Sequence, residues 1–329
     1  MMRVVIGSIV GLIALWLAFR GESPATLAAA IRQADLWWSA AALASIALSL
    51  ALVTVRWRVL FGRANRAPRL GPLFNALVLG QAVNIVLPIR VGELVRVLLI
   101  SRTQGQTFER TFVSVVAERL MDTGMVALVA AWLVLQMSFP PWLAGPIRWL
   151  TIVGLIVAGL GAALMLGGRR VSAYLSARVE RMTHQGMARL TERSATAAGE
   201  AAQLADGRTL TCALALSAAL LVLSVFTNYL LFRAFHLSIP PVAAVLVLLV
   251  LQVGSAPVST PGNLGVFQYL TVLALGVYAV DRTTAVAYSV VLYAIAYGPK
   301  LVLGAWLMAR MSRDAVLWPD LLALIRTRR

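Results

Sequence analysis

Long apolar runs constrain this chain more than any other feature of its sequence. The hydrocarbon core of a bilayer is about 30 Å thick, so a helix needs about 20 apolar residues to cross it. Six runs approach or exceed that length, at residues 4–20, 36–56, 111–137, 146–167, 209–232 and 283–309. Charged residues make up only 13% of the chain, against about a quarter in a soluble domain. The sequence therefore predicts an all-α polytopic membrane protein with six full spans, and it excludes a soluble enzyme, a disordered tail and a nucleic-acid-binding domain.

Two further apolar regions, residues 71–101 and 242–280, are interrupted near their middles by proline and glycine. Proline removes a helical hydrogen bond, and glycine permits a tight turn. Broken backbone at membrane depth is tolerated only where protein or a water-filled cavity surrounds it. Each region is therefore predicted to form a re-entrant, broken-helix hairpin. The backbone of the first hairpin is expected to turn at Pro88 and Gly92. The backbone of the second is expected to turn at Pro257, Pro261, Gly262 and Gly265.

The basic residues predict how the spans are oriented. The chain has 29 basic and 13 acidic residues, a net charge of +16, and such an excess belongs in cytoplasmic loops. Arginines gather in the segment that begins at Arg56, in the loop 168–208 and in the tail 312–329, so all three are expected inside the cell. The loop 168–208 is expected either to lie on headgroups as a helix or to be a solvated linker. The run 4–20 is expected to be a retained anchor, because no small-x-small cleavage site follows it as in a signal peptide.

Keeping all three basic segments inside requires each interrupted region to enter and leave the membrane on the same side. Both termini are then cytoplasmic, and the order span, span, hairpin, span occurs twice with opposite orientation. The predicted repeats cover residues 1–137 and 146–311, and a basic amphipathic tail follows at 312–329. Inverted repeats with broken helices that meet near the midplane are typical of alternating-access transporters.

Six charged residues, three basic and three acidic, fall at membrane depth in the first repeat. Each would cost about 3 kcal/mol if it faced lipid tails, so all six are expected to face the interior. One interpretation is a salt-bridge clamp between the first hairpin and the next span. A second is that the arginines bind a phosphate or another anion, and a third is that a carboxylate carries a coupling proton. The residues are Arg90, Glu93, Arg96, Glu118, Arg119 and Asp122.

The second hairpin carries no charge between Gln252 and Gln268. Free N–H groups at a half-helix start near Gly262 and Asn263 are predicted to receive an anionic group, unless the break only allows close packing. Lys300 is the only lysine and lies inside the last predicted span. It is a further candidate for the anion site, because it lies too deep to snorkel to the surface.

No motif for a cofactor, a metal or a catalytic nucleophile is present. One cysteine, Cys212, excludes an intrachain disulfide and a cysteine-based metal site, and neither histidine has a partner at metal-ligand spacing. No cofactor, no metal and no enzymatic activity are therefore expected.

Three segments together resemble motifs of one family: residues 84–96, which begin with Asn84, residues 118–122 and residues 261–267. The family is the lysylphosphatidylglycerol synthase transmembrane region family, also called the flippase-like domain family, the membrane half of the multiple peptide resistance factor. The resemblance covers about residues 35–310. It implies a bacterial or archaeal inner-membrane protein that translocates lipids or assists lipid-modifying enzymes. Some members of the family are linked to hopanoid or glycolipid pathways. The resemblance also adds Asn84 to the candidate lipid-binding residues.

The chain departs from this family pattern in two ways. Only about 20 residues follow residue 309, so no aminoacyl-transferase domain and no lysyl transfer are expected in this chain. Gln268 stands where many members have a glutamate, which weakens a proton role at that position.

The main hypothesis is a lipid flippase or lipid transporter that binds a phosphate-bearing headgroup of a membrane phospholipid between the two hairpins. Arg90, Arg96 and Arg119 would hold the phosphate, and the three carboxylates would brace them. The alternatives are a non-transporting membrane partner of a lipid-modifying enzyme and a proton-coupled transporter of a small anion. A homo-oligomer is left open, and no nucleic-acid partner is expected.

Overall fold

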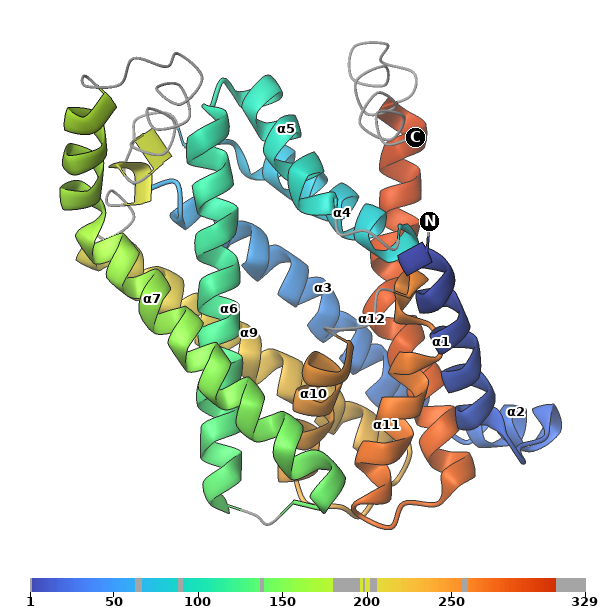
Figure 1. Ribbon diagram of the computed structural model, residues 1–329. Coiled ribbons are helices and arrows are strands. Elements are labelled where there is room, and N and C mark those ends of the chain that lie inside the picture. Colours follow the sequence, from blue (N-terminus) through green and yellow to red (C-terminus); the bar gives the residue numbers. More distant parts are fainter. Residues whose placement is uncertain are drawn as a thin grey trace. The chain divides into compact units, whose positions relative to one another are not determined.

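The computed structural model describes residues 2–62, 67–87, 91–136, 139–179, 196–197, 199–201, 206–255 and 260–311 (Figure 1). Within these ranges the regular structure is helical throughout, and no strand is present. The helices are α1 (Met2–Phe19), α2 (Pro24–Arg32), α3 (Leu36–Val59), α4 (Leu70–Val86), α5 (Gly92–Gln104), α6 (Phe108–Gln136), α7 (Pro141–Val179), α9 (Gly207–Ala234), α10 (Val242–Ser255), the 3-10 turn η1 (Pro261–Asn263), α11 (Val266–Gly276) and α12 (Arg282–Met311).

All six predicted spans form helices, and four of them are long and apolar enough to cross a membrane. These four lie within α3, α7, α9 and α12. Of the other two, α1 is shorter, and α6 carries several charged residues along its 29 residues. The prediction of an all-α membrane protein is confirmed. The helix α7 continues to Val179, so the first part of the predicted loop 168–208 is helical.

Both predicted interruptions are confirmed as helix breaks. The first separates α4 from α5, and the second separates α10 from α11, with η1 between them. The short helix α2 was not predicted. The sequence did contain its start signal, because Pro24 occupies the first turn and Ser23 Oγ accepts a hydrogen bond from Thr26 N–H at 3.1 Å.

The chain divides into two compact units. The first comprises Met1–Leu50, Phe74–Arg96 and Leu223–Arg329, and the second comprises Ala51–Leu73 and Val97–Val222. Each unit draws on both predicted repeats, so the boundary between the units is not the predicted boundary between the repeats. The inverted relationship of the repeats therefore stays a prediction.

The first unit is built around the second break. There α11 packs against α10, α12 and α1, and α12 also packs against α2. Figure 1 shows α1, α11 and α12 side by side. In the second unit α6 packs along α7, where small residues such as Gly154 lie against Ala127. Small residues at such contacts let two helix backbones approach closely in a membrane.

Candidate functional site

The first helix break is closed by the side chain of Asn84, near the end of α4. Its Oδ1 accepts a hydrogen bond from Gly92 N–H at 2.7 Å, and its Nδ2 donates to Glu93 Oε2 at 2.9 Å. Gly92 begins α5, so Asn84 satisfies one of the N–H groups that a helix start leaves without a partner. Glu93 lies in the first turn, where the helix dipole favours a negative charge. Asn84 and Glu93, both predicted site residues, therefore bond to each other and fix the start of α5.

Glycines bring α4 and α5 into backbone contact beside this cap. A Cβ atom on Gly92 would overlap the carbonyl oxygen of Gly80, and one on Gly80 would lie 2.5 Å from Arg96 Cγ. Arg96 is only 1% exposed, so its aliphatic stem lies buried across Gly80. Gly92 and Arg96, both predicted site residues, thus lie in the contact between α4 and α5.

The backbone of the second break satisfies its own N–H groups. The N–H groups of residues 263 and 264 donate to carbonyl oxygens within the turn, at 3.1 and 3.2 Å. Gly265 N–H donates to Gln268 Oε1 at 2.7 Å. The prediction that free N–H groups near Gly262 and Asn263 await an anion is therefore wrong for residues 263–265, because the turn and the Gln268 carboxamide already use them.

The helix α1 forms one wall of the second break. Gly265 has φ +82°, and a Cβ atom there would overlap the carbonyl oxygen of Gly11. A Cβ atom on Gly11 would in turn lie 3.0 Å from Thr260 Cγ2 and 3.0 Å from the carbonyl oxygen of Leu264. The predicted anchor helix is thus part of the architecture of the break.

The end of α4 and the 3-10 turn η1 meet within the first unit. A Cβ atom on Gly262 would lie 3.5 Å from the carbonyl oxygen of Ile85, one residue before the end of α4. The hydroxyl of Tyr293 on α12 donates to the carbonyl oxygen of Gly262 at 2.9 Å. Farther along α12, Gly304 lies directly against Ala82 of α4. Three elements, α4, η1 and α12, therefore converge at this point, which we call the hairpin junction.

Lys300 lies on the face of α12 that forms the hairpin junction. Residues 293, 297, 300 and 304 follow each other at steps of four, three and four, so they share one helix face. Lys300 Nζ lies 5.7 Å from the ring centroid of Tyr297, whose hydroxyl accepts a hydrogen bond from Asn263 Nδ2 at 3.5 Å. In the part of the chain that the structure describes, no carboxylate pairs with Lys300. The hairpin junction thus includes two of the residues predicted to bind an anion, the cation Lys300 and the amide Asn263.

A second charged cluster lies in the second unit and centres on Arg56 of α3. Its Nη1 donates to Asp122 Oδ1 at 2.5 Å, and its Nη2 donates to Asp122 Oδ2 at 3.2 Å. Nη2 also lies 3.5 Å from Glu118 Oε1, and Nη1 donates to Ser217 Oγ at 2.9 Å. The side chains of Arg56 and Glu118 are only 1% and 3% exposed. One guanidinium therefore ties α3, α6 and α9 together.

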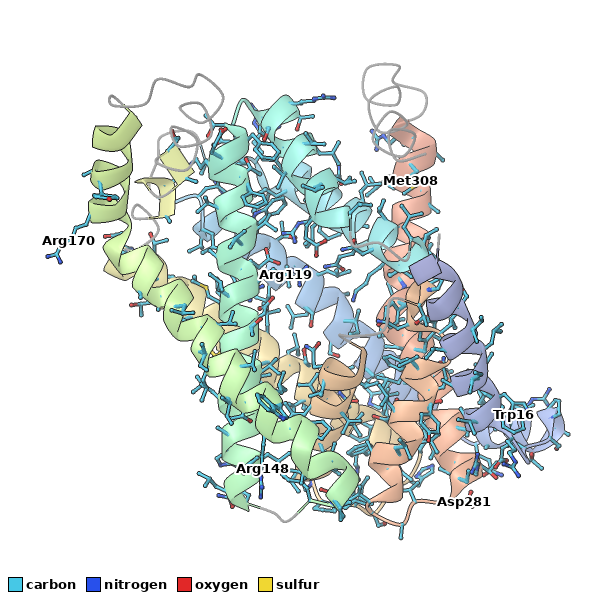
Figure 2. All side chains as sticks on the ribbon, viewed as in Figure 1. Trp16, Arg119, Arg148, Arg170, Asp281 and Met308 are labelled. Carbon is cyan, nitrogen blue, oxygen red and sulfur yellow. The ribbon has the colours of Figure 1, made fainter. Side chains whose placement is uncertain are left out.

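The prediction that Arg56 begins a cytoplasmic loop is wrong, because α3 continues to Val59 and buries Arg56. Glu118 and Asp122 were predicted to brace Arg90, Arg96 and Arg119, and the structure gives them Arg56 as a partner. Arg119, by contrast, is exposed on α6, where Figure 2 shows it near the middle of the helix.

The predicted site residues are therefore divided between the two units. The first unit holds Asn84, Gly92, Glu93, Arg96, Pro261, Gly262, Asn263, Gly265 and Lys300, and the second holds Glu118, Arg119 and Asp122. The remaining predicted residues, Pro88, Arg90 and Pro257, lie outside the described residues. The sequence-based prediction missed Arg56 and Tyr293. Tyr293 lies seven residues before Lys300, and this spacing could have placed the two residues on one face of a helix.

Apolar helices with two broken segments and buried charges define a multi-pass, all-helical membrane protein. Within that class, the profile of the lysylphosphatidylglycerol synthase transmembrane region matches residues 4–304, so the chain belongs to this family. It is similar to a UPF0104 membrane protein of Methanothermobacter thermautotrophicus, with 24% identity over 326 residues that cover 94% of this chain and 93% of that protein. No solved structure matches the chain.

Proposed function

We propose that this chain binds the phosphate of an anionic lipid at the hairpin junction and moves the lipid between the leaflets of the membrane. The observation that carries this proposal is Lys300, a cation inside an apolar helix with no carboxylate partner among the described residues. A charge within the bilayer costs about 3 kcal/mol on insertion scales. Such a residue is retained where it meets a charged ligand or water.

The surroundings of Lys300 suit a phosphate. Asn263 adds an amide N–H on the other side of Tyr297, whose hydroxyl it contacts at a long 3.5 Å. At the two half-helix starts, Asn84 and Gln268 already accept from the N–H groups of Gly92 and Gly265. The broken helices that meet at this point are the arrangement in which transporters bind substrates near the midplane. Family membership supports a lipid as the source of the phosphate.

The proposal includes the orientation predicted from charge. The basic segments lie in the cytoplasm, both termini are inside, and the two repeats are inverted in the plasma membrane. The proposal assigns no headgroup contact to Arg56 in the second unit, because Glu118 and Asp122 already engage its guanidinium. No catalytic step is required.

Replacing Lys300 with methionine tests the proposal. We expect acyl-labelled phosphatidylglycerol to cross proteoliposomes at least about tenfold more slowly, because a charge-assisted hydrogen bond of about 1.5–3 kcal/mol is lost. Lys300→Arg, which keeps the charge, should retain a measurable rate. The measurement is dithionite bleaching of the label in the outer leaflet.

Three outcomes would contradict this proposal. Equal rates in Lys300→Met and wild type would show that the junction is not the site. Binding of phosphatidylglycerol without transfer would favour a non-transporting partner of a lipid-modifying enzyme. Uptake of inorganic phosphate driven by a pH gradient, with no lipid transfer, would identify a small-anion transporter.

A further inference from the structure

Two buried oxygen atoms beside the hairpin junction have no hydrogen-bond partner among the residues that the structure describes. They are Oε1 of Gln81 on α4 and Oγ1 of Thr260, the residue that precedes η1. Thr260 is only 5% exposed. Buried polar atoms are almost always paired, so each such atom needs an explanation, and a ligand that is absent is one.

Both atoms flank the same contact. Gln81 precedes Ile85 by one helical turn, so the two residues share a face of α4. The carbonyl oxygen of Ile85 lies next to Gly262, which is two residues after Thr260. Gln81 therefore lies on the α4 side of this contact and Thr260 on the side of the chain that leads into η1, with its methyl group against Gly11 of α1.

We propose that Gln81 and Thr260 select a phosphodiester lipid whose headgroup carries hydrogen-bond donors, either hydroxyl or ammonium groups. This inference rests on the proposed function. Lys300 recognises the phosphate, which all such lipids share, and the two oxygens accept from donors that only some headgroups have. A site with buried acceptors rejects a ligand that lacks the matching donor, because the acceptors then stay unpaired.

The test compares phosphatidylglycerol with phosphatidylmethanol, two lipids of equal charge and equal acyl chains. Glycerol provides two hydroxyl donors, whereas the methyl ester provides none. We expect the purified full-length chain to bind phosphatidylglycerol about tenfold more tightly in competition against an acyl-labelled phosphatidylglycerol. Glycerol 3-phosphate serves as the soluble competitor, and it should compete weakly if the phosphate must come from a lipid.

The variants Gln81→Met and Thr260→Val keep the shape of each side chain and remove its acceptor. Each should reduce the preference for phosphatidylglycerol severalfold and leave phosphatidylmethanol binding unchanged. Neither should lower the melting temperature of the lipid-free protein, because an unpaired buried polar atom is replaced by an apolar one.

The matched control Lys300→Met should weaken both lipids equally and preserve their ratio. If it weakens neither lipid, the proposed function fails. If wild type binds both lipids equally, or the preference survives in Gln81→Met and Thr260→Val, only the inference about headgroup donors is overturned, and water pairs the two oxygens.

Discussion

Gly265→Ala is expected to prevent the second break from closing and to destabilise the protein by more than about 3 kcal/mol. Gly265 has φ +82° and ψ −56°, a conformation that is strained for any residue with a side chain. Its Cβ would also overlap the carbonyl oxygen of Gly11, and that atom belongs to backbone that has no rotamer by which to move. The measurement is thermal unfolding of the purified protein in detergent.

Gly159→Ala is the matched control for this substitution. Gly159 lies within α7, and a Cβ atom there would meet nothing within 4 Å. Alanine is better than glycine in a helix by about 0.5–1 kcal/mol, so this variant should be as stable as wild type or more stable. Equal melting temperatures for the two variants would contradict the assignment of Gly11 and Gly265 as a forced backbone contact.

The sequence was sufficient to predict the long apolar helices and both breaks, but not α2 or the ends of α3 and α7. Apolar composition decides which segments enter a membrane, and that is a local property, as the match of the predicted run 36–56 to α3 (Leu36–Val59) illustrates. The breaks were equally predictable, because proline and glycine act on their own turn of backbone. Whether the repeats are inverted depends on tertiary arrangement, which no local signal carries.

Charge counting failed at Arg56 for a physical reason. The predicted span ended at the first arginine because an arginine at a span end usually snorkels to the headgroups. The apolar residues Trp57 and Val59 around Arg58 were the signal that the helix continues past Arg56. The partner of Arg56 lies 66 positions away at Asp122, and only the packing of α3 on α6 brings the two together.

The helix starts also differ from expectation because distant or internal side chains cap them. Asn84 reaches across the first break to Gly92, and Gln268 folds back to Gly265. A side-chain carboxamide thus accepts from a backbone N–H group at a helix start in each hairpin. Asn84 precedes the helix that it caps, whereas Gln268 lies within the helix that it caps. Since these carboxamides already pair with the Gly92 and Gly265 N–H groups, the proposed anion site relies on the side chain of Lys300.

Arg56→Met is expected to destabilise the second unit by about 3–5 kcal/mol, the usual cost of removing one partner from a buried ion pair. The loss leaves Glu118 and Asp122 as neighbouring carboxylates on one turn of α6, without their guanidinium. Arg56→Lys should recover only part of the stability, because an ammonium group does not reproduce the two-pronged contact with Asp122.

Neutralising the carboxylates separates the charge effect from the loss of packing. In Arg56→Met combined with Glu118→Gln and Asp122→Asn, no buried charge is left uncompensated, so the triple variant should be more stable than Arg56→Met alone. Arg58→Met, an exposed arginine on the same helix, should change the stability by less than about 0.5 kcal/mol. If the triple variant is instead less stable than Arg56→Met, Arg56 acts through its packed stem and its bond to Ser217. The cluster would then be a packing contact between α3, α6 and α9 in which the charges matter little.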